Sequence, residues 1–194
     1  LLTSNARDSL RSVDTVIISH YHGDHVNGLV MADGSPAFPN AEILVPATEH
    51  KYWMDDGEMS RAPAGRMEGL FKNNRRVFSG DILKQVKQYE AGKEIAPGIT
   101  AVATPGHTPG HTSHIISSGG KSLFVQADVT NVPFLFARNP GWHLLFDQDA
   151  KLAEETRRLH PDRRRGGVEL LGPPVLGQRL VAVAGEAGLQ AEAE

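Results

Sequence analysis

The stretch at residues 20–25, with the sequence HYHGDH, places three imidazoles and one carboxylate within six residues. An apolar run precedes it and predicts a strand, at whose end His20 and His22 point to the same side because side chains alternate along a strand. Asp24 and His25 follow where the chain must turn, so four ligand groups converge from one loop. Neutral imidazole and carboxylate bind zinc and related divalent metals. The spacing therefore favours a metal site over a polar surface loop that is rich in histidine.

A second histidine-bearing stretch lies at residues 104–111, with the sequence TPGHTPGH. Its prolines and glycines exclude regular structure, so we expect His107 and His111 on a rigid loop at the end of a strand. A further predicted strand delivers Asp128 at its C-terminal end. An aspartate after a strand is usually a turn former, but this one arrives where a metal site needs negative charge.

The composition limits the classes of function. A chain of 194 residues is long enough for one domain with a sizeable core. The formal net charge of −3, with both signs interspersed, offers no basic surface for nucleic acid, which leaves a small-molecule substrate as the expected partner. There is no cysteine, so a metal here must be held by nitrogen and oxygen atoms.

Neither a membrane span nor a signal peptide is indicated. No apolar run reaches the about 18 residues of a membrane-spanning helix, and the first residues lack the pattern of a signal segment. The default expectation is therefore a soluble, cytoplasmic protein. Because the first residue is Leu1 and not methionine, we expect the natural N-terminus to lie elsewhere.

Hydrophobic periodicity and turn residues outline the elements that must position these side chains. His50 is interpreted as a surface residue, Tyr52 and Trp53 as core residues, and 55–76 as a mobile excursion with some helix. Asp24 and Asp149 are candidate helix caps. We expect helices at 5–11, 24–31, 48–54 and 149–159, strands at 13–19, 41–46, 85–90, 98–104 and 180–184, and a hairpin of strands 114–118 and 121–126.

The pattern H-x-H-x-D-H, followed by T-P-G-H-T-P-G-H and an aspartate after a strand, resembles the metallo-beta-lactamase fold superfamily. Residues 37–41 (AFPNA) and the repeat at 104–111 look most like the branch of methyl parathion hydrolase and the N-acyl-homoserine lactonases. The resemblance covers approximately residues 10–160. It implies an α/β (α+β) fold, a four-layer αββα sandwich with a two-metal site at one edge of the sheets.

The resemblance also implies which side chains hold the metals, expected to be one or two Zn²⁺ ions, with Mn, Co or Fe as alternatives. His111 is similar to a histidine that supports the loop without touching metal, and His114 and His143 match no functional role. The implied ligands are His20, His22 and His107 for the first metal, Asp24 and His25 for the second, and Asp128 as the bridge.

The implied activity is hydrolysis of an ester, a lactone or an organophosphate. A bound metal lowers the pKa of water toward neutrality and polarises the oxygen of the group under attack, so the resemblance predicts a metal-bound hydroxide as nucleophile. In this branch the carboxylate that matches Asp24 is the catalytic proton donor to the leaving alkoxide. No motif indicates a serine or cysteine nucleophile.

The sequence departs from the superfamily pattern at both ends. Members carry one more ligand, a histidine on a late strand, whereas no histidine follows His160, which lies at the end of a predicted helix. Members also carry several strands before the H-x-H-x-D-H loop. We therefore expect a metallo-beta-lactamase-like domain over 1–160 that is short at its N-terminus, and an atypical, disordered or frame-shifted tail over 161–194. A sheet left uncovered by missing strands favours association, so a homodimer is an open expectation.

Two other functions stay open at this point. One is a metal-binding scaffold without turnover, which the absent last ligand favours. Without that ligand, we expect the first metal site to be complete and the second to be partly occupied. A redox member of the superfamily, similar to a persulfide dioxygenase, is the other alternative, and iron content tests it. A flavodiiron protein normally needs acidic substitutions in the metal motif, which this chain lacks.

Overall fold

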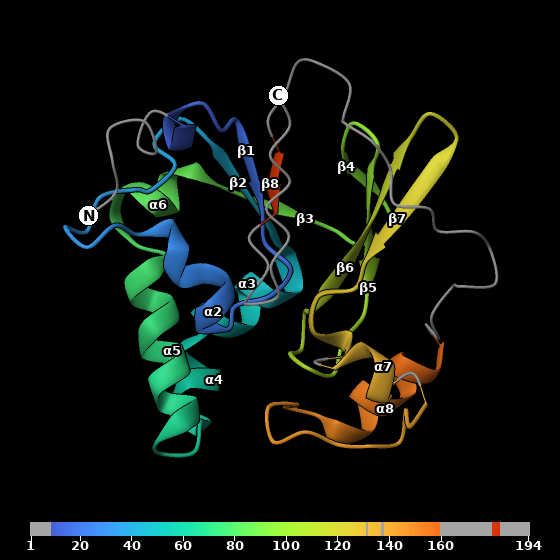
Figure 1. Ribbon diagram of the computed structural model, residues 1–194. Helices are drawn as coiled ribbons and strands as arrows, with labels where there is room; N and C mark the ends of the chain where they lie inside the picture. The colour runs from blue at the N-terminus through green and yellow to red at the C-terminus, as the bar shows by residue number, and fades with distance from the viewer. Residues whose placement is uncertain (1–8, 131, 137, 160–179, 183–194) are drawn as a thin grey trace.

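Two four-stranded sheets face each other in the computed structural model, which describes residues 9–130, 132–136, 138–159 and 180–182 (Figure 1). The first sheet has the order β3-β2-β1-β8 and is parallel throughout, and the second has the order β4-β5-β6-β7 and is antiparallel. The strands are β1 (Thr15–Ile17), β2 (Glu42–Pro46), β3 (Val86–Tyr89), β4 (Glu94–Ala96), β5 (Ile99–Ala103), β6 (Thr112–Ser118), β7 (Lys121–Val125) and β8 (Leu180–Ala182).

Strand β1 lies inside the first sheet, between β2 and β8. Its residue Val16 is fully buried against the helices, whereas Ile17 belongs to a smaller apolar cluster that includes Leu44 of β2 and Ile99 of β5. Apolar side chains on both faces of a parallel strand are typical of a sheet that is covered on each side. The strand predicted at 13–19 is confirmed, in a shorter form.

The second sheet is a meander in which each strand pairs with the next one along the chain. The predicted hairpin is confirmed, because β6 and β7 pair around Gly119 and Gly120, which both have positive φ angles. Strand β4 was not expected from the sequence, where its region reads as two successive turns.

Helices cover the outer face of the first sheet and close one end of the second (Figure 1). Helices α3 and α6 contact β2, and α5 packs on α2 and α3. The helical segments are α2 (Gly23–Val26), η1 (Asn27–Leu29), α3 (Ala47–Met54), α4 (Asp56–Arg61), α5 (Arg66–Val77), α6 (Gly80–Gln85), η2 (Ala127–Val129), α7 (Pro133–Phe136) and α8 (Ala150–Leu159).

In the segment predicted as a mobile excursion with some helix, the helix is confirmed and is more extensive than expected. Helices α4 and α5 occupy most of it, and Phe71 and Val77 of α5 are fully buried in the larger core cluster. The sequence conceals the bounds of α5 because a polar residue, Asn74, interrupts its apolar stripe, although Asn74 is itself buried. Tertiary packing against α2 and α3 outweighs the weak local pattern.

The two predicted helix caps have different outcomes. Asp149 caps α8, since its Oδ1 accepts a hydrogen bond from the Leu152 amide at 2.9 Å. Asp24 is not a cap: the residue before α2 is His22, which makes no capping hydrogen bond, and Asp24 lies inside the first turn. The reason is that the helix begins one residue earlier than the sequence suggests.

The predicted α/β fold class is confirmed. Residues 9–11 of the first predicted helix are helical, and the strand expected at 180–184 is present as β8, paired in parallel with β1. The rest of the predicted tail, and His160 with it, lies outside the described residues. In the part of the chain that the structure describes, no helix combines the length and apolar character needed to cross a membrane.

Candidate metal centre

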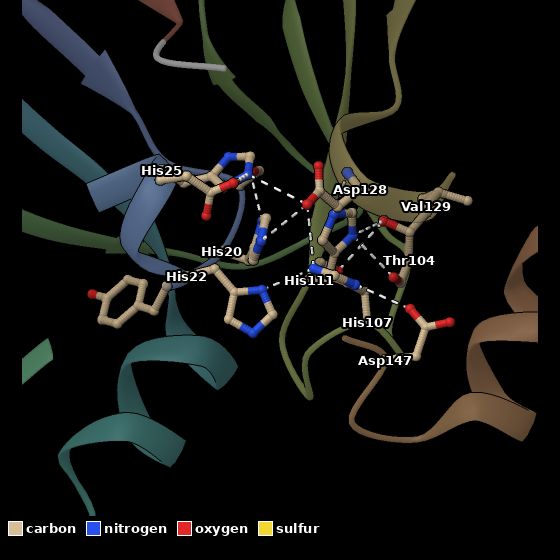
Figure 2. Close-up of polar contacts among 12 residues, drawn as sticks. His20, His22, His25, Thr104, His107, His111, Asp128, Val129 and Asp147 are labelled. Atoms are coloured by element: carbon tan, nitrogen blue, oxygen red, sulfur yellow. Dashed lines mark hydrogen bonds and ion pairs between the residues drawn. The ribbon is translucent and has the colours of Figure 1, made fainter. Parts of the chain in front are cut away.

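Four histidines and one aspartate meet where strands of both sheets end (Figure 2). His20, His22 and His25 come from the loop and short helix after β1, and all three are buried. His107 comes from the loop between β5 and β6, and Asp128 from η2 directly after β7. The two histidine-bearing stretches of the sequence, which are far apart along the chain, are therefore brought to one place.

The ligand atoms form two groups that share one histidine. His20, His22 and His107 each offer a nitrogen within 4.8 Å of the others, and His22 Nδ1 lies 2.8 Å from His107 Nε2. His20, His25 and Asp128 make a second group with the same spacing. Asp128 Oδ2 lies 3.7 Å from His20 Nε2, 3.4 Å from His25 Nε2 and 3.3 Å from His107 Nε2, so it contacts members of both groups.

Several of these nitrogens are buried without a hydrogen-bond partner: His20 Nε2, His22 Nε2 and both ring nitrogens of His25. A buried polar atom left unpaired costs about 1–3 kcal/mol, and imidazole nitrogen beside a carboxylate is a donor set suited to a divalent transition metal. The residues present therefore fit such an ion.

Burial and repulsion between neighbouring imidazoles favour the neutral forms of His20 and His22. Burial lowers the pKa of His20 well below its ordinary value and that of His22 to about 3, which favours the neutral form that binds metal. Burial opposes ionisation of Asp128, but its polar and charge interactions with His107 and His25 hold its pKa well below its usual value. The centre thus combines the neutral rings of His20 and His22 with one ionised carboxylate.

The ring of His107 is oriented from behind by Asp147. Its Nδ1 lies 3.0 Å from Asp147 Oδ1, and Asp147 Oδ2 lies 3.2 Å from the guanidinium of Arg157. The carboxylate accepts the Nδ1–H, which assigns the lone pair of Nε2 to the centre. Although burial acts to lower the pKa of His107, its contacts with Asp128 and Asp147 raise it.

His111 supports the loop and the aspartate. Its Nε2 accepts a hydrogen bond from the Asp128 amide at 3.1 Å, and its Nδ1 lies 3.0 Å from the carbonyl oxygen of Thr104. Both ring nitrogens are thereby occupied. The residue before Asp128, Ala127, has a φ of 50°, a left-handed conformation that is uncommon for alanine and sets the direction in which the aspartate leaves the chain.

The sequence pattern of the metallo-beta-lactamase superfamily matches residues 4–171. The chain belongs to that superfamily. An N-acyl homoserine lactonase from Bacillus sp. is 32% identical over 123 residues, which are 61% of this chain and 40% of that protein. The N-acyl homoserine lactonase AiiA of Bacillus thuringiensis subsp. kurstaki is 31% identical over the same shares. This chain thus spans about 40% of the length of these curated relatives.

Solved structures of the superfamily give the same placement. The hydrolase AbOPH superposes with a TM-score of 0.70 at 31% identity, covering 79% of this chain and 55% of that one. AidC, a dizinc quorum-quenching lactonase in complex with a product, superposes with a TM-score of 0.69 at 26% identity, covering 77% of this chain and 53% of that one. The predicted membership of the metallo-beta-lactamase superfamily is confirmed, and the chain's relatives and structural neighbours include N-acyl homoserine lactonases.

The remaining candidate residues lie around the metallo-beta-lactamase centre. The side chain of Asp24 is 61% exposed, with Oδ2 3.5 Å from His25 Nε2, and it belongs to neither group of ligand atoms; its role stays a prediction. His50 is half-buried, and its Nδ1 lies 2.8 Å from the Tyr21 hydroxyl oxygen. His114 contacts Tyr89, and His143 pairs with Glu154 at the surface.

The sequence did not reveal three buried charged residues beside the metallo-beta-lactamase centre: Glu49, Asp147 and Arg157. None of the three belongs to a recognisable sequence motif. The one available signal is that a charged residue occurs on the apolar side of a helix, as Arg157 does in α8.

Proposed function

We propose that this chain is a metal-dependent hydrolase that acts on lactones or related esters, organophosphates included. The observation that carries the proposal is the pair of ligand groups sharing His20, in which buried nitrogens of His20, His22 and His25 make no hydrogen bond. The lactonase relatives support a lactone as the substrate class. Zn²⁺ is the proposed metal because AidC is a dizinc enzyme, and Mn, Co or Fe are alternatives.

In this proposal His20, His22 and His107 hold the first ion. Asp24 and His25 would serve a second ion, and Asp128, which contacts members of both ligand groups, would be a shared ligand. A divalent ion in such a site lowers the pKa of a water molecule that it binds and polarises a carbonyl or phosphoryl oxygen.

The protein's own side chains supply orientation and proton transfer. Asp147 fixes the ring of His107, and His111 fixes the backbone of Asp128. The exposed carboxylate of Asp24 lies at the open side of the centre, where we propose that it delivers a proton to the leaving alkoxide.

The test is hydrolysis by protein loaded with Zn²⁺, Mn²⁺ or Co²⁺. N-hexanoyl homoserine lactone and an aryl ester are the substrates, and we expect turnover that a chelator abolishes. His22→Ala should reduce it to background, whereas the control His143→Ala, at an exposed histidine outside the centre, should retain it. Equal turnover in wild type and His22→Ala would refute the assignment.

A second candidate is a metal-binding protein of this superfamily without turnover. The observation that favours it is that, among the described residues, the second group consists of His20, His25 and Asp128 and shares His20 with the first. Stoichiometric metal content together with no hydrolysis of either substrate would support this candidate over the first.

A further inference from the structure

A single buried carboxyl group joins the two loops that carry the histidines. Glu49, in the first turn of α3, is fully buried. Its Oε1 accepts hydrogen bonds from the Tyr21 amide at 2.9 Å and from the indole of Trp53 at 2.8 Å. Its Oε2 accepts from the Gly110 amide at 2.7 Å. Tyr21 lies between the first two histidines of its loop, and Gly110 directly precedes His111.

The second loop lies directly on the backbone of α3 at this point. A Cβ atom at Gly110 would come within 2.2 Å of the Glu49 nitrogen and 2.6 Å of its Cα, so no side chain fits there. One backbone hydrogen bond, from the Thr112 amide to the Ser19 carbonyl at 3.0 Å, also joins the two segments. Glu49 therefore adds a second connection between the two loops, through its side chain, at Tyr21 and Gly110.

A carboxyl group suits this position because three N–H donors converge on it from different segments. Two of these donors are backbone amides in a buried place, and each would lose its partner if an apolar side chain replaced Glu49. Glutamine has nearly the same shape, but its NH₂ group would face one of the amides, donor against donor.

We propose that Glu49 is a positioning residue that fixes the distance between the His20–His22 pair and His107, and thereby sets the affinity of the centre for metal. Its carboxyl oxygens are occupied by N–H donors, so it acts through the two loops without contacting the metal. This inference rests on the proposed function, in which those histidines hold a divalent ion.

The test is titration of the metal-free full chain with Co²⁺ alone, followed by visible absorption, for wild type, Glu49→Gln and Trp53→Phe. In Glu49→Gln we expect affinity for Co²⁺ to fall about 10–100-fold, as for other residues that orient metal ligands, and the Co²⁺ absorption bands to shift. Trp53→Phe removes one donor but leaves both loop connections, so its affinity should stay close to that of wild type.

Amide hydrogen exchange in the metal-free proteins gives a readout that does not depend on metal. The amides of Tyr21 and Gly110 should exchange faster in Glu49→Gln than in Trp53→Phe, because only the former disturbs their acceptor. If wild type binds no Co²⁺, the proposed function fails. If wild type and folded Glu49→Gln bind it equally, the positioning role alone fails.

Glu49→Asp serves if Glu49→Gln does not fold. It keeps the carboxyl group but is one methylene shorter, so it cannot reach both loops at once, and its affinity for Co²⁺ should also fall. Gly110→Ala separates the same two backbones with Glu49 intact and should have the same effect. Wild-type affinity in folded Glu49→Asp or Gly110→Ala would overturn the proposal.

Discussion

Replacing Asp147 with asparagine should loosen the metal centre without touching any of its ligand atoms. The wild-type carboxylate is fully buried between His107 and Arg157, at 3.0 Å and 3.2 Å. Asparagine keeps an acceptor for His107 Nδ1–H but removes the negative charge that balances the guanidinium. The ring of His107 would then be held less firmly, with a less basic Nε2.

The contacts of Asp147 and Arg157 indicate how much stability and how much metal affinity should be lost. Removing one partner of a buried ion pair costs about 3–5 kcal/mol, but Arg157 also donates to the carbonyl oxygens of Val129, Pro140 and Trp142, which stay in place. We therefore expect Asp147→Asn to lower the free energy of unfolding by about 2–3 kcal/mol, and Tm by about 5–10 °C. Metal affinity should fall about 10–100-fold.

Two measurements check this prediction. Thermal unfolding in the presence of a chelator reports stability alone, and competition for Zn²⁺ against a chromophoric chelator reports affinity. Glu154→Gln is the matched control, because this acidic residue pairs with His143 and Arg158 at the surface and should leave affinity unchanged. Wild-type affinity for Zn²⁺ in folded Asp147→Asn would refute the reasoning that this carboxylate orients His107.

Two further predictions concern residues outside the ligand set. Burial lowers the pKa of His114 to about 4. As the pH is lowered from 6.5 to 4, the unfolded chain therefore takes up a proton that the folded chain does not. The free energy of unfolding should decrease by about 3 kcal/mol over this range. His114→Gln, measured by urea unfolding with chelator at each pH, should lack this part of the slope; an unchanged slope would contradict it. A Cβ at Gly106 would come within 2.2 Å of the Ala153 nitrogen, so Gly106→Ala should push the histidine loop off α8, destabilising the fold by about 3 kcal/mol or more and weakening Zn²⁺ binding. Gly69→Ala, in open space on α5, should instead stabilise by about 0.5–1 kcal/mol, and equal unfolding midpoints for the two variants would be inconsistent with this account.

The histidines of the candidate metal centre were predictable because their signal is local. His20 and His22 share one strand end, and His107 lies in a loop that Pro and Gly make rigid, so residue type and spacing suffice to indicate a site. The same holds for the β6–β7 hairpin, whose glycines mark the turn.

The supporting residues were not predictable, because their roles depend on contacts between distant segments. Glu49 meets an amide 61 positions away, and Asp147 meets His107 across 40 positions. Nothing in the neighbouring sequence distinguishes either residue from an ordinary surface acid. The bounds of helix α5 escaped prediction for a related reason, since only the packing of this helix on α2 and α3 makes its interrupted apolar stripe effective.

The position of β1 in its sheet bears on how the protein matures during synthesis. The strand that leads into the first histidine loop pairs on one side with β2, which follows soon after it, and on the other with β8, at residues 180–182. Chains emerge from the ribosome N-terminus first, and contacts between distant segments form slowly. His20, His22 and His25 are therefore synthesised well before the strand at residues 180–182 that completes the described sheet beside them. Metal uptake is accordingly expected to follow synthesis of that strand, in competition with other cellular ligands for the same ion.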